Sequence, residues 1–288
     1  MNRLCGITNV MKRFLLTVFA LIASRLVAPA AAETVVASPW LDFREAKVRL
    51  LAAQPAVGKP VVAGLEIRLS EGFKTYWRTA GDSGVPPVFD FSKSTGLEAI
   101  EVTFPFPMIF DDGAGGKAWG YKQAVVLPIT AKHTGGAAVF ALKLDFAVCG
   151  TMCIPLSGNL TLEPASANPV PAAEAEALAK ASGLIPVAVK AETAPRPVIQ
   201  RLKAGEAQWS VRLPFTGDVA AFCAFPEAKG FLEASEFSAS GDGFIRFTIS
   251  GQAAPGAGGQ FGPVLLTYGV PGAAYERMID LDGAPVAP

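Results

Sequence analysis

Two cysteines separated by three residues are the most chemically capable feature of the sequence. Cys149 and Cys153 flank the short segment Gly150-Thr151-Met152, so a disulfide between them would close a ring of only five residues. Loop-closure entropy grows with ring size, and such a ring stabilises a fold by less than the ~3 kcal/mol expected for a fifteen-residue loop. Small, strained disulfides are also the more easily reduced ones. The spacing therefore makes thiol–disulfide exchange a candidate chemistry.

Two other interpretations of the cysteine pair stay open on the residues alone. The bridge could be a passive staple, with Gly150 supplying the tight turn and Pro155 ending the ladder beyond it. Alternatively, Cys149, Met152 and Cys153 could bind copper(I), because soft thiolate and thioether ligands suit that ion. The motif contains no histidine and no second methionine, which weakens the copper interpretation.

The remaining candidate side chains favour structural roles. His133 is the one histidine, and its Lys-His-Thr-Gly-Gly context predicts an exposed loop rather than a catalytic base. Cysteine hydrolases place a histidine next to the nucleophile, so hydrolase chemistry is disfavoured. Cys223 stands in an apolar run and is predicted to be a buried, inert thiol. Trp119 and Tyr121 alternate with a glycine and should share one face of a strand, either flanking the cysteines or filling the core.

The sequence predicts that these residues are positioned by β-strands. Apolar composition is 51%, enough for two ordinary cores in 288 residues. Short apolar runs broken by Gly and Pro predict an all-β chain with two β-sandwich domains, at residues 33–165 and 198–288. The intervening residues 166–197 are rich in proline and contain an Ala/Glu run, Ala172 to Ser182, followed by a glycine. This stretch is predicted to be a linker with one short helix.

The N-terminal residues 1–32 are expected to be a signal peptide. The basic residues Lys12 and Arg13 come first, an apolar run follows them, and small residues then continue to Ala32. Such a segment would direct the chain to the periplasm, an oxidising compartment, and would be cleaved after Ala32. No later stretch approaches the ~20 apolar residues of a membrane span, so no membrane insertion of the mature chain is expected. Without residues 1–32, which contain four of the 25 Lys and Arg residues and none of the 25 Asp and Glu residues, the chain is slightly acidic. This balance gives no reason to expect nucleic acid as a partner.

Three stretches resemble a known family. They are Lys74 to Pro87, then Trp119 to Tyr121 leading to Val126 to Pro128, and finally Cys149 to Pro155. Together they resemble the N-terminal periplasmic domain of the thiol:disulfide interchange protein DsbD, particularly the form in the copper-sensitivity suppressor ScsB. The C-terminal part is more loosely similar to the second sandwich of the ScsB-like form.

The resemblance implies immunoglobulin-like sandwiches and a cysteine pair that carries electrons without a further cofactor. A membrane thiol-electron transporter would reduce the pair, which would then reduce periplasmic thioredoxin-fold proteins. By motif position Cys153 would attack and Cys149 would resolve, while Asp112 would tune the ionisation of the thiol. The resemblance further implies a role connected with cytochrome c biogenesis and copper tolerance.

Two departures from the family pattern shape the expectations. Glycines at 113, 115 and 116 stand where the family has a shielding aromatic, so shielding is expected from Phe110 or Trp119. The sequence ends at Pro288 without a membrane or thioredoxin-like domain. We therefore expect a separate membrane partner. The alternative is a non-catalytic sandwich that binds a protein partner or copper(I), with Cys149 and Cys153 as a structural disulfide.

Overall fold

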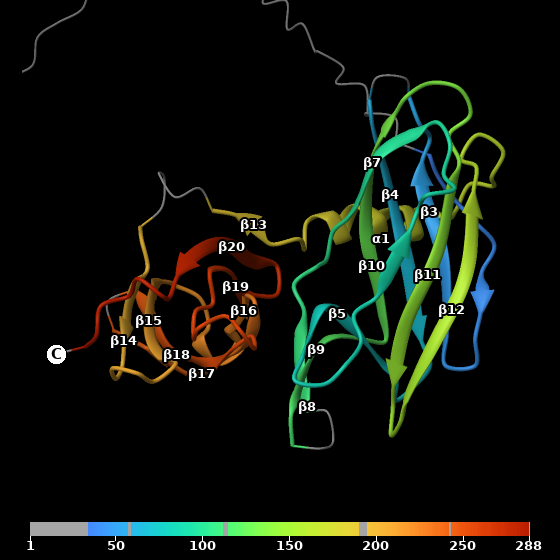
Figure 1. The fold of residues 1–288 in the computed structure, drawn as a ribbon. Helices are drawn as coiled ribbons and strands as arrows, with labels where there is room; N and C mark the ends of the chain where they lie inside the picture. The colour runs from blue at the N-terminus through green and yellow to red at the C-terminus, as the bar shows by residue number, and fades with distance from the viewer. Residues whose placement is uncertain (1–33, 57–58, 112–114, 190–194, 242, 288) are drawn as a thin grey trace, which may run out of the picture. The chain divides into compact units, whose positions relative to one another are not determined.

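β-Strands make up most of the described structure. The computed structural model describes residues 34–56, 59–111, 115–189, 195–241 and 243–287, and the expected signal peptide lies outside them. Within these ranges the chain forms two β-sandwiches, and a single α-helix precedes the second (Figure 1). The predicted all-β fold class with one short helix is confirmed. None of the described helices has the length and apolar composition needed to cross a bilayer.

The first sandwich pairs two six-stranded sheets. One sheet has the order β1-β3-β4-β10-β7, with β2 beside β3, and the other has the order β12-β11-β5-β9-β8, with β6 beside β11. The first sheet consists of β1 (Val35–Ala37), β2 (Leu41–Asp42), β3 (Ala46–Ala53), β4 (Pro60–Leu69), β7 (Leu97–Val102) and β10 (Ala124–His133). The second consists of β5 (Lys74–Gly81), β6 (Val88–Asp90), β8 (Met108–Asp111), β9 (Lys117–Lys122), β11 (Phe140–Cys149) and β12 (Cys153–Leu162).

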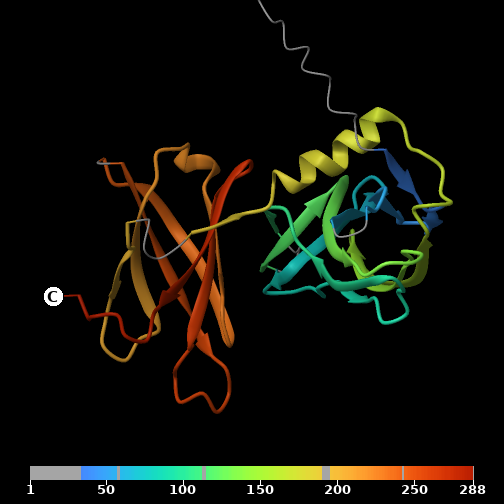
Figure 2. The ribbon, with the colours of Figure 1, turned by 90° about the horizontal axis from the view of Figure 1, so that it is seen from above.

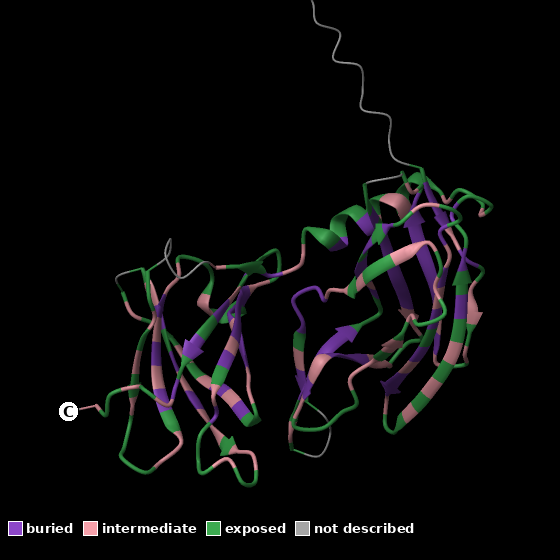
Figure 3. Cartoon of the chain, turned by 45° about the horizontal axis from the view of Figure 1, so that its top comes forward, coloured by how far each residue is buried: buried purple, intermediate pink, exposed green. Residues whose placement is uncertain are grey.

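Alternation of side chains along the strands builds the core between these sheets. Successive side chains of a strand point to opposite faces, so every second residue can be buried. Along β11 the residues Phe140, Leu142, Leu144, Phe146 and Val148 all belong to the main core cluster. The burial pattern is visible along the strands in Figure 3. The residues between them in sequence face outward, which is the side on which Cys149 lies.

Helix α1 (Ala172–Ser182) has the bounds that the Ala/Glu run predicts. It begins after Pro171 and ends before Gly183, whose N–H donates to the carbonyl oxygens at the end of the helix. Leu178 is its buried anchor, packed with Val35 and Leu51 of the first sandwich. Figure 2 shows the helix lying along that sandwich.

The second sandwich pairs two four-stranded sheets, with the orders β13-β20-β19-β16 and β14-β15-β18-β17. Its strands are β13 (Val187–Ala188), β14 (Val198–Arg201), β15 (Gln208–Pro214), β16 (Cys223–Glu227), β17 (Gly230–Ala239), β18 (Phe244–Ala253), β19 (Pro263–Val270) and β20 (Ala273–Asp280). The apolar run from Val219 onward predicts a strand, but Val219–Ala221 is a 3₁₀ turn. The Asp218 carboxylate caps this turn by accepting from the Ala220 N–H, so the strand starts only at Cys223.

Candidate functional site

The cysteine pair closes the tip of the β11–β12 hairpin. Strand register places Cys149 directly opposite Cys153, and the two form a disulfide with Cα atoms 4.1 Å apart. The three residues between them make the turn, in which the Gly150 N–H donates to the Met152 carbonyl oxygen at 3.1 Å. The hairpin ladder therefore holds the two sulfurs together whether or not they are bonded.

The two cysteines differ sharply in their exposure. Cys149 is only 2% exposed, whereas Cys153 is an exposed residue. Met152 beside it is 73% exposed. Because thiol–disulfide exchange requires access to the sulfur that is attacked, an outside thiolate can reach Cys153 much more easily than Cys149. In that attack Cys149 is the leaving group.

Tyr76 on β5 is the polar partner of both sulfurs. Its hydroxyl oxygen lies 2.6 Å from Cys149 Sγ and 3.2 Å from Cys153 Sγ. Sulfurs in a disulfide carry no hydrogen, so here the hydroxyl is the donor. A hydrogen bond to a charged group is stronger than one to a neutral group, so the same hydroxyl would favour a thiolate at Cys149.

Tyr76 is a residue of the site that the sequence pattern alone does not single out. Neighbouring residues of a strand face opposite sides. Trp77 faces the main core, while Tyr76 joins the outer cluster with Cys149. The order of the two residues was an available signal, because only one of two neighbouring rings in a strand can face the core. Tyrosine carries a polar hydroxyl, so Tyr76 is the ring expected on the outer face.

The predicted supporting residues separate onto two faces of the same sheet. Phe110 lies in the small apolar cluster that contains Cys149 and Tyr76. Trp119 and Tyr121 share a face, but it is the core face: Trp119 packs 6.2 Å from Trp77 between ring centroids. The Tyr121 hydroxyl donates to the Pro105 carbonyl oxygen at 2.7 Å. These two rings therefore do not line the cysteine cluster.

Asp112, the carboxylate expected to tune the thiol, lies outside the described residues. His133 is buried at the end of β10, not exposed in a loop, and its Nε2 lies 3.0 Å from the Gly136 carbonyl oxygen. Cys223 is free and half-buried, and burial raises the pKa of its thiol. Within the described ranges no three His, Cys, Asp or Glu side chains gather in a way that could hold a metal ion.

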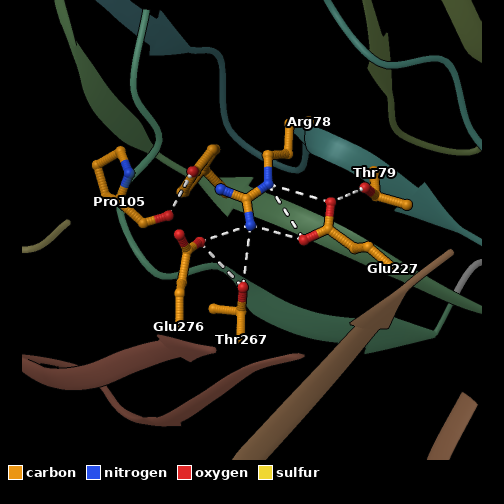
Figure 4. A network of polar contacts seen from close by, with 7 residues as sticks. Arg78, Thr79, Pro105, Glu227, Thr267 and Glu276 are labelled. Atoms are coloured by element: carbon orange, nitrogen blue, oxygen red, sulfur yellow. Dashed lines mark hydrogen bonds and ion pairs between the residues drawn. The ribbon is translucent and has the colours of Figure 1, made fainter. Parts of the chain in front are cut away.

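Residues of β5 that follow Tyr76 contact the second sandwich. Arg78 Nη2 lies 2.6 Å from carboxylate oxygens of both Glu227 and Glu276, and it donates to Thr267 Oγ1 at 2.9 Å (Figure 4). The neighbouring Thr79 hydroxyl also donates to Glu227. One arginine thus gathers side chains from β16, β19 and β20.

An aromatic contact accompanies these polar contacts. The Phe225 ring of β16 lies 5.4 Å from the Trp77 ring, 5.0 Å from the Trp119 ring and 5.3 Å from the Phe106 ring, measured between centroids. Phe225 is completely buried and belongs to the core cluster of the first sandwich. The strand that presents Tyr76 to the disulfide therefore has its next residue, Trp77, packed against the second sandwich.

Comparison with known proteins identifies the domain that carries the site. The family model described as thiol:disulfide interchange protein DsbD, N-terminal, matches residues 47–164. No curated protein sequence matches the chain. The crystal structure of the N-terminal periplasmic domain of ScsB from Proteus mirabilis is similar in fold, with a TM-score of 0.69 and 21% identity, over 88% of this chain and 99% of that chain. The segment with the Cys149–Cys153 disulfide is therefore a DsbD N-terminal-like domain.

Proposed function

We propose that the Cys149–Cys153 pair is a thiol–disulfide exchange site that carries electrons between protein partners. The observation that supports this most directly is the asymmetry of the pair: an exposed Cys153 joined to a buried Cys149 whose sulfur meets the Tyr76 hydroxyl. A disulfide serving only as a staple has no need of one accessible sulfur and one hydrogen-bonded leaving group. The DsbD N-terminal-like character of the domain agrees with this function.

Reduction of the site follows from this geometry. A thiolate of the reductant attacks Cys153 Sγ, forming a mixed disulfide as the Cys149–Cys153 bond breaks. The bonding pair of electrons leaves with Cys149 Sγ, which the Tyr76 hydroxyl stabilises as a thiolate. The second thiol of the reductant then attacks its own sulfur in the mixed disulfide and releases Cys153. Two electrons have moved to the site, and the reductant has become a disulfide.

Delivery of the electrons reverses these roles. The Cys153 thiolate attacks one sulfur of the partner's disulfide, and the other partner sulfur leaves as a thiolate. Cys149 then attacks Cys153 Sγ, which restores the bridge and releases the partner as a dithiol. The hairpin favours this second step, because register keeps Cys149 directly opposite Cys153.

The family suggests which kinds of protein donate electrons to the pair and accept electrons from it. We propose a membrane thiol transporter as the electron donor and a periplasmic thioredoxin-fold protein as the acceptor. The periplasmic location is supported by the described origin of the structurally similar ScsB domain. If the pair does not exchange electrons, the alternative is a β-sandwich with a structural disulfide that binds copper(I) or a protein partner.

A redox titration tests the proposal. The protein and its Cys223→Ala variant are equilibrated in glutathione or dithiothreitol buffers, and free thiols are counted by alkylation and mass measurement. We expect reversible opening of the pair between about −150 and −270 mV, the range of known exchange proteins, in both forms. A bridge that stays closed below about −300 mV, or that never forms, would mean that the pair does not exchange electrons.

A further inference from the structure

A groove of about 950 Å³ opens beside the disulfide hairpin. Gly150, which directly follows Cys149, is part of its lining. Phe73 lines it as well, close enough that a Cβ atom on Gly150 would lie 3.3 Å from its ring. Phe110, which packs in the apolar cluster around Cys149, forms another part of the wall. The groove therefore begins at the redox site.

A row of two lysines runs from the buried cysteine into this groove. In the sheet register Cys149 of β11 pairs with Lys74 of β5, which in turn pairs with Lys122 of β9. Directly opposed residues of antiparallel strands project to the same face of the sheet. Neighbouring strands are ~4.8 Å apart, so the two lysines start about 5 Å and about 10 Å from the cysteine strand.

Both ammonium groups are held over the same aromatic ring. The Nζ atoms of Lys74 and Lys122 lie 4.6 Å and 5.8 Å from the centroid of the Phe110 ring. Lys74 Nζ also donates to the Asp111 carbonyl oxygen at 2.7 Å. A cation over an aromatic face keeps its charge while its position becomes restricted. The row is therefore a positioned pair of positive charges.

These positive charges are not neutralised by the surrounding side chains. Among the described residues, no carboxylate forms an ion pair with Lys74, with Lys122 or with Lys47, the third lysine of the groove. The lining holds four cationic side chains against the two carboxylates of Glu71 and Asp111. The fourth cation, Arg68, is paired with Glu66 at 2.6 Å and with Glu174 at 3.7 Å. The groove keeps a net positive charge.

We propose that this groove is the docking surface for an acidic segment of the protein that exchanges electrons with Cys153. The inference rests on the proposed function and adds the chemistry of the partner. An approaching protein must bring its sulfur to the exposed Cys153, and the groove starts at the same hairpin. Complementary charge speeds such encounters and sets their orientation. Carboxylates of the partner that lie on the Lys74–Lys122 row would orient its disulfide toward the hairpin.

The test uses small disulfides that differ in charge. The reduced Cys223→Ala protein is mixed with dithiodipropionate, which is anionic, hydroxyethyl disulfide, which is neutral, or cystamine, which is cationic. Reoxidation of the pair is followed by acid quench, alkylation and mass measurement. The same protein is compared with a Lys74→Gln/Lys122→Gln double variant. The control double variant, Lys59→Gln/Lys93→Gln, removes two exposed lysines that are not part of the groove lining.

The expected result is a change that depends on the charge of the probe. Relative to the neutral probe, loss of Lys74 and Lys122 should slow reoxidation by dithiodipropionate about fivefold and speed reoxidation by cystamine, since each exposed charge pair contributes a modest attraction or repulsion. The control variant should change all three rates equally or not at all. The double variant should slow a Glu-rich peptide that contains a disulfide more than it slows dithiodipropionate, because an extended acidic segment can cover the groove.

The possible failures are distinguishable. If all probes reoxidise the pair and the variant slows them by one common factor, the groove does not select acidic partners, although the exchange function stands. If only dithiodipropionate responds and the Glu-rich peptide does not, the groove accepts a small anion and the docking proposal is wrong. If no disulfide reoxidises the pair, the exchange function fails and the docking proposal fails with it.

Discussion

At the scale of single residues, one hydroxyl group, that of Tyr76, contacts both sulfurs of the proposed exchange site. Replacing Tyr76 by Phe keeps the ring in the apolar cluster and removes the hydrogen bond to Cys149 Sγ. A hydrogen bond to a charged group contributes about 1.5 to 3 kcal/mol, so a thiolate leaving from Cys149 loses that support. We expect reduction of the disulfide by dithiothreitol to slow by about tenfold or more, measured by timed alkylation.

Tyr121 supplies the matched control on the opposite face of the sheet. Its hydroxyl donates to the Pro105 carbonyl oxygen and lies in the core, away from the sulfurs. Tyr121→Phe should lower the free energy of unfolding by about 1 kcal/mol and leave the reduction rate unchanged. Equal reduction rates in Tyr76→Phe and in the unmodified protein would remove the hydroxyl from the mechanism.

At the scale of elements, the turn after β5 packs against the Tyr76 ring. Gly84 has a φ of 150°, and a Cβ atom there would lie 2.4 Å from the ring carbon Cε1 of Tyr76. Gly84→Ala must therefore displace the ring or the turn, and we expect both slower reduction of the disulfide and lower stability. Gly72→Ala is the control, because its φ of 82° brings similar backbone strain but no atom lies within 4 Å of the new Cβ. If both variants reduce at the same rate, the ring position does not matter.

Patterns within single elements were predictable from the sequence, whereas the faces of neighbouring strands were only partly so. The Ala/Glu run of α1 and the short apolar runs of strands such as β11 are local signals, and both appear in the structure as expected. The exposure of the cysteine hairpin and the location of Phe110 depend on which strands pair, which no local pattern encodes. Trp119 illustrates the limit: its alternation with Tyr121 predicted a shared face, but only the packing against Trp77 decides that this face is the core.

At the scale of the whole molecule, the second sandwich meets the first through residues of the strand that bears Tyr76. Phe225 completes an aromatic cluster that the first sandwich would otherwise expose at Trp77 and Trp119. Beside it the Arg78 side chain is 26% exposed, and the carboxylates of Glu227 and Glu276 are 17% and 20% exposed. This partial burial makes the ion cluster more consequential than a pair on the open surface.

Arg78→Leu measures how strongly this contact ties the sandwiches together. Without the guanidinium, Glu227 and Glu276 are left half-buried beside each other, and like charges in such surroundings repel. We expect the free energy of unfolding in urea to fall by about 2 kcal/mol, or the second sandwich to unfold separately from the first. The control Lys117→Ala breaks the more exposed pair with Glu233 and should cost less than about 1 kcal/mol. A larger loss is expected for Arg78→Leu because only this variant leaves two carboxylates facing each other. Similar losses in the two variants would mean that Arg78 contributes no more than an exposed ion pair, and that the aromatic contact of Phe225 is what joins the two sandwiches.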